Sequence, residues 1–397
     1  MDDLKFELQD ETRKGARIKV IGIGGGGSNA VARMYEEGLD GVEFYIMNTD
    51  AQALEASRVP VKLQIGARVT NGLGCGSDPA IGRQAALEDT ERILAILEGA
   101  DLVFITAGLG GGTGAGVSPV VATLAKQLDA LTIAIVTKPF TFEGGKRMRQ
   151  AENSVHDLAA SVDILTTIPN DRLLSIAPKG TSMGQAFKLA DDVLRQAVQG
   201  ISEIILNPGL INLDFSDIKS AISGMGHALI GTATANGPNA AVEAARAAIN
   251  SPLLEDTRIK GARQVLMNIT GSSEIGLHEV NEACSIIRDA ADNDEMQLNF
   301  GVIANEAMGD QVKVTVIATG FTQPADTRES VIEQKPAAEF FAERTPEPMW
   351  AEPSPAPPPA PAAPPVVEAP PAPMAAASVF EEELDVPAYL RQGKLLN

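Results

Sequence analysis

The sequence predicts an α/β protein with a mainly parallel sheet and helices on both of its faces. Short apolar runs alternate along the chain with segments of helical periodicity, an order that is typical of parallel sheets. Glycine-rich stretches at residues 22–27, 72–76 and 108–116 lie between these elements. Ligands of such sheets bind beyond the carboxyl ends of the strands, so we expect the three stretches to share one binding edge.

Composition narrows the class of protein. The chain has 397 residues, enough for two domains and a tail, and a formal net charge of -20, which argues against a nucleic-acid partner. No apolar run approaches the roughly 20 residues of a membrane span. The acidic, polar start argues against a signal peptide. Cys75 and Cys284 lack zinc-site spacing, which fits a reducing cytoplasm.

The first half is predicted to be a nucleotide-binding domain, residues 17–180, after a flexible leader of residues 1–16. Its expected strands are residues 18–23, 42–47, 62–65, 102–107, 131–136 and 164–168. Its expected helices are residues 29–37, 78–97, 117–128 and 144–160.

Residues 109–116 form the densest glycine stretch, with five glycines in the last seven positions. Glycine lets the backbone turn tightly and approach a ligand closely, and the N–H groups at the following helix start favour an anion such as phosphate. The hydroxyl of Thr113 could bond a phosphate oxygen or a water on Mg²⁺. A tight turn without a ligand is the alternative.

The first glycine stretch matches a dinucleotide-binding pattern at Gly22, Gly24 and Gly27. Asp50 follows Gly27 at about the distance at which such folds bind a ribose. A nicotinamide-dependent oxidoreductase is therefore a second hypothesis.

A long central helix is predicted over residues 181–206, because apolar residues recur at three- and four-residue spacing and Pro208 and Gly209 end the run. Asn212, Asp214 and Asp217 follow it. Asp217 either caps the next helix or forms, with Asn212 and Asp214, a polar cluster that orients and activates water.

The second half is predicted to be an α+β domain, residues 207–320. Its expected strands are residues 228–233, 264–269, 300–304 and 312–318, and its expected helices are residues 239–249 and 277–290. Sixteen of the 25 prolines lie beyond Gly320, which predicts a disordered linker over residues 321–380. Apolar residues return in a predicted docking peptide, residues 381–397.

In its motifs the chain resembles the FtsZ family, the bacterial tubulin-like cell-division GTPases. The matching runs are residues 18–29, 48–50, 72–76, 108–116, 139–147, 187–192 and 207–217. The resemblance implies a tubulin-like fold and a cytoplasmic protein that assembles with GTP into head-to-tail filaments. By the same resemblance, these filaments would form the division ring at mid-cell beneath the inner membrane, and GTP hydrolysis at the subunit interface would drive their turnover.

The resemblance also implies roles for single residues. GTP or GDP, with Mg²⁺, would be bound by Gly24, Gly25, Gly26, Gly27, Ser28, Asn29, Asn48, Asp50, Gly74, Cys75, Gly76, Gly110, Gly111, Gly112, Thr113, Gly114, Glu143, Arg147, Asn170, Phe187 and Asp191. Phe187 would stack on guanine and Asp191, or its neighbour Asp192, would bond the edge of the base. Asn212, Asp214 and Asp217 would serve hydrolysis. Residues 384–397 would bind adaptors such as FtsA, so contact with the membrane would be indirect.

Helix length adds a geometric argument to the resemblance. If Asp191 contacts guanine, Leu206 lies about 22 Å further along the same helix. Asp214 and Asp217 would then reach a nucleotide on the next subunit more easily than their own, and such heterologous contacts generate filaments.

The sequence is therefore consistent with three classes of function. The assembling GTPase is favoured over the oxidoreductase and over a scaffold that polymerises without turnover. An ordinary P-loop NTPase is excluded because no Gly-Lys-Ser/Thr motif is present.

Overall fold

A computed structural model describes residues 15–178, 180–207, 209–211, 213–251 and 259–321. The predicted leader up to residue 14, Asn212, and the predicted linker and docking peptide from residue 322 lie outside the described residues. Within the described residues, no helix is both long and apolar enough to cross a membrane.

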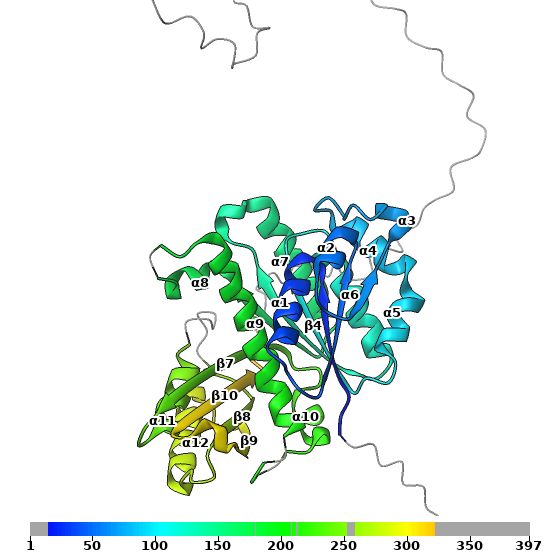
Figure 1. Ribbon diagram of the computed structural model, residues 1–397. Helices are drawn as coiled ribbons and strands as arrows, with labels where there is room; N and C mark the ends of the chain where they lie inside the picture. The colour runs from blue at the N-terminus through cyan, green and yellow to red at the C-terminus, as the bar shows by residue number, and fades with distance from the viewer. Residues whose placement is uncertain (1–14, 179, 208, 212, 252–258, 322–397) are drawn as a thin grey trace, which may run out of the picture. The chain divides into compact units, whose positions relative to one another are not determined.

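The described strands form one sheet in the order β3-β2-β1-β4-β5-β6-β7-β10-β8-β9 (Figure 1). Their bounds are β1 (Ile18–Ile23), β2 (Val42–Asn48), β3 (Val61–Gln64), β4 (Leu102–Gly108), β5 (Leu131–Lys138), β6 (Ile164–Pro169), β7 (Gly226–Asn236), β8 (Gln264–Gly271), β9 (Gln297–Ala304) and β10 (Gln311–Thr319). β1 to β6 pair in parallel, whereas β10 pairs antiparallel with both β7 and β8. The predicted mainly parallel sheet is thereby confirmed.

Helices cover both faces of the parallel half. The bounds of the helices there are α1 (Gly24–Glu36), α2 (Ala51–Ala56), α3 (Ala67–Thr70), α4 (Pro79–Glu88), α5 (Thr90–Leu97), α6 (Thr113–Gln127), η1 (Thr141–Glu143), α7 (Gly145–Ala159) and α8 (Asn170–Ile176). Alternate residues of a strand point to opposite faces. On β1, Val20 belongs to the core under α1 and α9, and Ile21 to the core under α5, α6 and α7.

The long helix α9 (Met183–Leu206) lies between the parallel half and the strands β7 to β10 (Figure 1). Its apolar face, with Leu194, Val198 and Ile201, packs into the core of the parallel half. The remaining elements are α10 (Phe215–Ile222), α11 (Ala240–Ile249), α12 (Leu277–Ala291) and η2 (Glu306–Met308). α11 and α12 share a core with β7, β8 and β10. The predicted central helix and second α+β region are both present.

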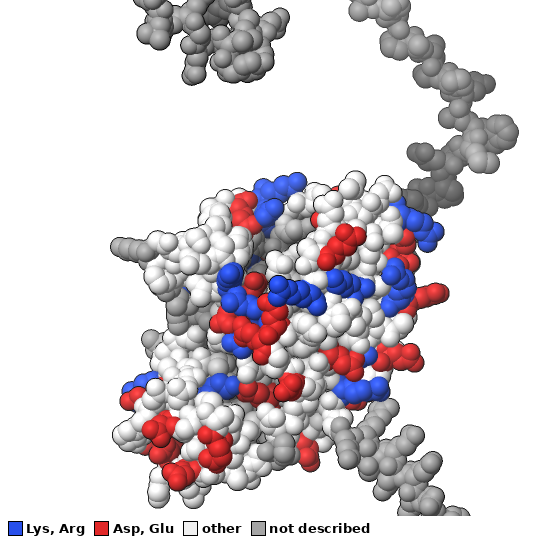
Figure 2. All heavy atoms as spheres, viewed as in Figure 1, with Lys and Arg blue, Asp and Glu red and all other residues white. Residues whose placement is uncertain are grey.

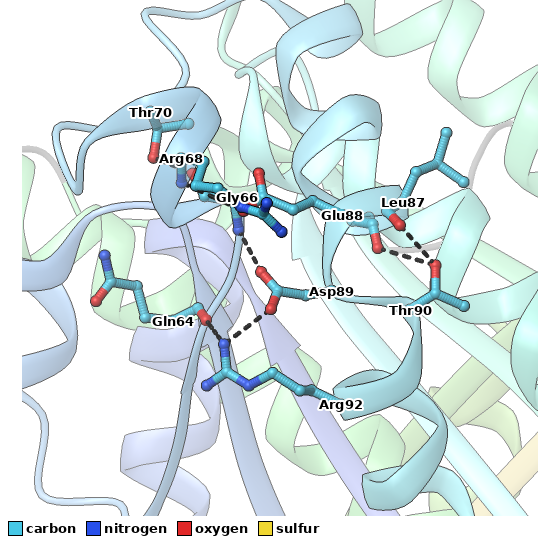
Figure 3. A network of polar contacts seen from close by, with 10 residues as sticks. Gln64, Gly66, Arg68, Thr70, Leu87, Glu88, Asp89, Thr90 and Arg92 are labelled. Carbon is cyan, nitrogen blue, oxygen red and sulfur yellow. Dashed lines mark hydrogen bonds and ion pairs between the residues drawn. The ribbon is translucent and has the colours of Figure 1, made fainter.

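One predicted helix proves to be two. Asp89 interrupts the expected helix of residues 78–97 between α4 and α5, with φ -106° and ψ 25°. Its carboxylate accepts hydrogen bonds from the backbone N–H of Gly66, at 2.7 Å, and from Arg92, at 2.9 Å (Figure 3). The side chain thus provides a hydrogen-bond acceptor for the turn after β3, and the helix is interrupted at Asp89. Helical periodicity does not reveal such a contact between distant segments.

Two predicted helix starts were too late. α1 begins at Gly24 rather than at residue 29, and α6 begins at Thr113 rather than at residue 117. Glycine in a helix interior is about 1 kcal/mol less favourable than alanine, and for this reason the sequence predicts a loop at both places. The structure puts these glycines in the first helical turns because the turns lie directly against strands.

Candidate nucleotide-binding site

A cavity of about 380 Å³ opens beyond the carboxyl ends of β1, β4, β5 and β6. Pockets of roughly 300–1,000 Å³ hold cofactors and other small molecules. The predicted nucleotide-binding residues that line it are Gly25, Gly26, Gly111, Gly112, Thr113, Gly114, Glu143, Arg147, Asn170, Phe187 and Asp191. The expected binding edge of the sheet is therefore a real cavity.

Two helix N-termini border one end of this cavity. α1 contributes Gly25 and Gly26, and α6 contributes Thr113 and Gly114. A Cβ atom on Gly114 would lie 2.4 Å from the carbonyl oxygen of Gly108, so only glycine allows this approach. Unpaired N–H groups and the helix dipoles favour negative charge here, and this end suits phosphate groups.

Other predicted residues do not line the cavity. They are Gly24, Gly27, Ser28, Asn29, Asn48, Asp50, Gly74, Cys75, Gly76 and Gly110. A Cβ atom on Gly27 would lie 2.1 Å from the carbonyl oxygen of Thr106, and one on Gly110 would lie 2.8 Å from that of Arg147. In the structure these two glycines permit close packing that shapes the wall.

Asn48 and Asp50 fix the turn that follows β2. The side-chain oxygen of Asn48 accepts from the N–H of Thr49 at 2.9 Å and of Asp50 at 3.3 Å. The carboxylate of Asp50 caps α2 by accepting from the N–H of Gln52 at 2.9 Å. This capping role counts against the ribose ligand that the oxidoreductase hypothesis requires.

The opposite end of the cavity offers an aromatic ring and unpaired polar groups. Phe187 is 43% exposed and meets Phe140 edge-on, with 5.6 Å between the ring centroids. Asn170 is 5% exposed, and its buried side-chain oxygen has no hydrogen-bond partner among the described residues. Buried polar groups are nearly always paired, so this oxygen is available to a ligand. A planar base with hydrogen-bonding edges fits such surroundings.

Of two adjacent carboxylates on α9, only Asp191 lines the cavity. Asp192 is engaged by its own helix, since it accepts from Arg195 Nε at 2.9 Å and from Gln196 Nε2 at 2.7 Å. Burial raises the pKa of Asp191 from 3.8 to about 6, and the nearby positive charge of Arg33 partly opposes that rise. Ionisation of Asp191 therefore lowers the free energy of unfolding of the protein without a ligand.

We expect Asp191→Asn to stabilise the unliganded protein at neutral pH. Because the folded-state pKa is raised, the folded protein holds more protons between about pH 4 and 6, and the free energy of unfolding declines as pH rises through that window. Removing the ionisation should raise the free energy of unfolding by about 1–2 kcal/mol at pH 7.5, and by less at pH 5. Urea unfolding at both pH values measures the gain.

Asp192→Asn is the matched control for this prediction. It removes a carboxylate that has a partner in Arg195, so it should lower or leave unchanged the stability at pH 7.5. Equal gains for the two variants would contradict the assignment of an unfavourable buried charge to Asp191.

Glu143 and Arg147 form a fixed pair at the cavity. Arg147 Nη1 donates to Glu143 Oε2 at 2.5 Å, and Glu143 Oε1 accepts from the N–H of Phe140 at 3.0 Å. The pair presents both a donor group and an acceptor group to a ligand, as the hydroxyls of a sugar require.

The acidic residues beyond α9 lie away from the cavity. Asp214 immediately precedes α10, and its side chain makes no capping hydrogen bond; Asp217 lies in the first turn. Both are exposed. The prediction that Asp217 caps this helix is therefore wrong, because Asp217 lies inside the first turn, and the Asp214 carboxylate is available for another role.

The segment that leads to Asp214 is held by the edge of β9. The N–H of Leu210 donates to the carbonyl oxygen of Val302 at 2.7 Å, and the N–H of Val302 donates to that of Ile211 at 3.1 Å. A Cβ atom on Gly209 would lie 2.4 Å from the Val302 oxygen, so glycine is needed for this pairing. Asp214 is thus presented from a backbone that is anchored on the sheet.

Helix α9 separates the cavity from the acidic residues. Asp191 lies in its first half and Leu206 at its end, about 22 Å apart at the rise of an α-helix. Figure 1 shows α10, which follows Asp214, at the far end of α9 from α8. Neither Asp214 nor Asp217 lines the cavity.

Charged side chains of both signs gather over α1 and α9 (Figure 2). Glu37, which follows α1, forms an ion pair with Arg195 of α9 at 2.8 Å and accepts a hydrogen bond from Arg33 at 3.4 Å, which joins the two helices. Exposed ion pairs contribute little individually, but this network orients α9 against α1.

Some cavity residues were not among those predicted to bind. They are Gly108, Leu109, Thr137, Pro139, Ala190 and Leu194. Two signals could have found them. Gly108, Thr137 and Pro139 lie at the carboxyl ends of predicted strands, and Ala190 and Leu194 share a helix face with Phe187 and Asp191.

Two family models match this chain. The family model described as Tubulin/FtsZ family, GTPase domain, matches residues 17–178, and that described as FtsZ family, C-terminal domain, matches residues 226–322. Together they span both halves of the sheet. The oxidoreductase hypothesis is therefore wrong.

Solved structures show the same likeness. An empty FtsZ dimer from M. jannaschii is 40% identical, with a TM-score of 0.72, and the match covers 78% of this chain and 89% of that chain. CetZ2 from Haloferax volcanii, described as a GTPγS-bound protofilament, is 22% identical, with a TM-score of 0.69 and coverage of 77% and 94%. The second likeness supports the fold alone.

Proposed function

This chain belongs to the FtsZ family of tubulin-like GTPases, and from that premise we propose that it hydrolyses GTP at the contact between two head-to-tail copies. The observation that carries the proposal is that the cavity lies beside the first half of α9, whereas Asp214 follows the end of that helix. A contact between unlike ends repeats without closing, so it generates a filament.

In the proposed complex the glycine-lined end of the cavity binds the phosphates. N–H groups at the starts of α1 and α6 donate to phosphate oxygens, and the hydroxyl of Thr113 adds a side-chain contact. Mg²⁺ usually binds nucleotide phosphates with few protein ligands, and Thr113 is the protein hydroxyl placed to assist it. When bound, the ion would neutralise charge that develops on the phosphates.

Guanine would occupy the other end. Phe187 stacks on the ring, the carboxylate of Asp191 accepts from the N–H groups of the base edge, and the unpaired oxygen of Asn170 accepts a further donor. Glu143 and Arg147 contact the ribose. Hydrogen bonds from guanine would offset the cost of the buried Asp191 charge, which gives preference for this base over adenine.

Hydrolysis requires a water positioned in line with the terminal phosphate. In the proposed mechanism Asp214 and Asp217 of the adjacent copy accept hydrogen bonds from this water and orient it, with Asn212 in the same loop. Phosphoryl transfer depends mostly on such positioning and on charge stabilisation. Loss of the terminal phosphate then weakens the contact, which drives filament turnover.

At the cellular level we propose that the filaments form a division ring at mid-cell. Residues 384–397 would bind adaptors such as FtsA, and these would link the filament to the inner membrane. The support is the sequence, where an apolar pattern returns after a proline-rich linker.

The proposal predicts that GTP turnover per subunit rises with protein concentration. A subunit without neighbours has no acidic residues near its phosphate, so its rate should be small until filaments form. Phosphate release and light scattering, measured together after adding GTP across a dilution series, should rise at the same concentration. Turnover that stays constant down to the unassembled protein would contradict it, and assembly without phosphate release would favour a scaffold.

A further inference from the structure

Three side chains meet in a closed triangle beneath the phosphate end of the cavity. Thr49 Oγ1 lies 2.8 Å from Thr113 Oγ1 and 3.3 Å from Cys75 Sγ, and Thr113 Oγ1 donates to Cys75 Sγ at 3.6 Å. Thr49 is fully buried and Cys75 is 4% exposed. Only Thr113 reaches the cavity wall.

The three residues come from three different glycine-flanked or strand-end turns. Thr49 follows β2, Cys75 lies between Gly74 and Gly76, and Thr113 begins α6. A Cβ atom on Gly112 would lie 2.6 Å from the Cβ of Cys75, so the second and third turns are closely packed. The triangle therefore connects three turns near the phosphate end, and the start of α1 is not part of it.

The number of protons in the triangle determines which acceptor the Thr113 hydroxyl can donate to. Each hydroxyl or thiol has one proton to donate. If Cys75 donates to Thr49 and Thr49 donates to Thr113, the Thr113 proton is free for an oxygen in the cavity. Without an acceptor there, Thr113 can donate to Cys75 Sγ, which is the geometry observed.

We infer that Thr49 and Cys75 are positioning residues that orient the Thr113 hydroxyl to donate to a phosphate oxygen of the bound nucleotide. The inference rests on the proposed nucleotide site. Hydrogen bonds to a charged acceptor are among the stronger ones, so a misdirected Thr113 proton weakens phosphate binding. Neither Thr49 nor Cys75 contacts the nucleotide in this account.

Thr49→Val tests the inference, because it keeps the shape of the side chain and removes its hydroxyl. Loss of one charge-assisted bond should weaken GTP binding roughly tenfold, with a comparable fall in kcat/KM. Guanosine, which has no phosphate, should bind as tightly as to the unchanged protein. Titration calorimetry with GTP, and competition with guanosine, give the two affinities.

Two further variants separate positioning from packing. Thr49→Ser restores the hydroxyl and should recover most of the GTP affinity. Thr132→Val removes a hydroxyl that is equally buried but bonds to the carbonyl oxygen of Ala130, and it should leave both affinities unchanged.

Equal loss of GTP and guanosine affinity in Thr49→Val would overturn the inference in favour of a general structural role, and so would unchanged GTP affinity. Failure of the unchanged protein to bind GTP would instead refute the proposed function, so the two failures are distinguishable.

Discussion

Asp214→Ala should bind GTP and assemble with it, while phosphate release per subunit falls at least roughly a hundredfold. A group that orients or activates the attacking water contributes about that much or more to a rate. Asp214 lies outside the nucleotide cavity, is exposed, and makes no capping hydrogen bond, so its removal should spare both nucleotide affinity and stability. Sedimentation with GTP and phosphate release measure assembly and turnover separately.

Asp157→Ala is a suitable control for Asp214→Ala, because Asp157 is an exposed carboxylate on α7. It should turn over GTP normally. Near-normal turnover by Asp214→Ala would remove this residue from the mechanism, and loss of GTP binding would show that it supports the fold or the pocket instead.

The second large effect is expected for Gly111→Leu, which should lower GTP affinity about a hundredfold or more. Gly111 lines the cavity, and nothing lies within 4 Å of a Cβ atom built on it. The empty protein can therefore accept the leucine, which then occupies space that the phosphates need. The loss corresponds to about two charge-assisted hydrogen bonds.

Gly184→Leu controls for the change of residue. Gly184 also has open space around its Cβ position, but it lies in the first turn of α9 and outside the cavity. Neither variant should unfold at a lower midpoint than the unchanged protein, and only Gly111→Leu should lose GTP binding in calorimetry. Tight GTP binding by Gly111→Leu would show that the phosphates do not lie against this turn.

The sequence predicted the binding edge well because strand ends and glycine stretches are local signals. Apolar runs located the strands of the parallel half, and Phe187 and Asp191 lie on the predicted long helix. Topology then brings the turns together, because the carboxyl ends of parallel strands share one edge of the sheet.

What the sequence could not predict depends on contacts between distant segments. Gly27 and Gly114 lie in the first turns of helices, where their backbones pack against β4, and Asp89 interrupts a helix and bonds Gly66. The triangle around Thr49 joins turns that are far apart along the chain. Propensity describes a residue in its own segment, so it cannot reveal any of these.

The same limit applies to the adjacent acids Asp191 and Asp192. They differ by one position on α9, and only packing shows that one lines the cavity while the other bonds to Arg195. The sequence motif identified the acidic residues after α9. Their distance from the cavity could be estimated from the sequence only because a single helix of predictable length lies between them.

The most direct test of catalysis across a subunit contact is a mixture of Gly111→Leu and Asp214→Ala. Alone, each variant should be nearly inactive, the first for lack of bound GTP and the second for lack of the acid. In an equal mixture, random head-to-tail contacts pair an intact cavity with an intact acidic loop in roughly a quarter of junctions. Phosphate release should then recover to about that fraction of the normal rate, whereas a mixture no more active than its separate components would contradict the account.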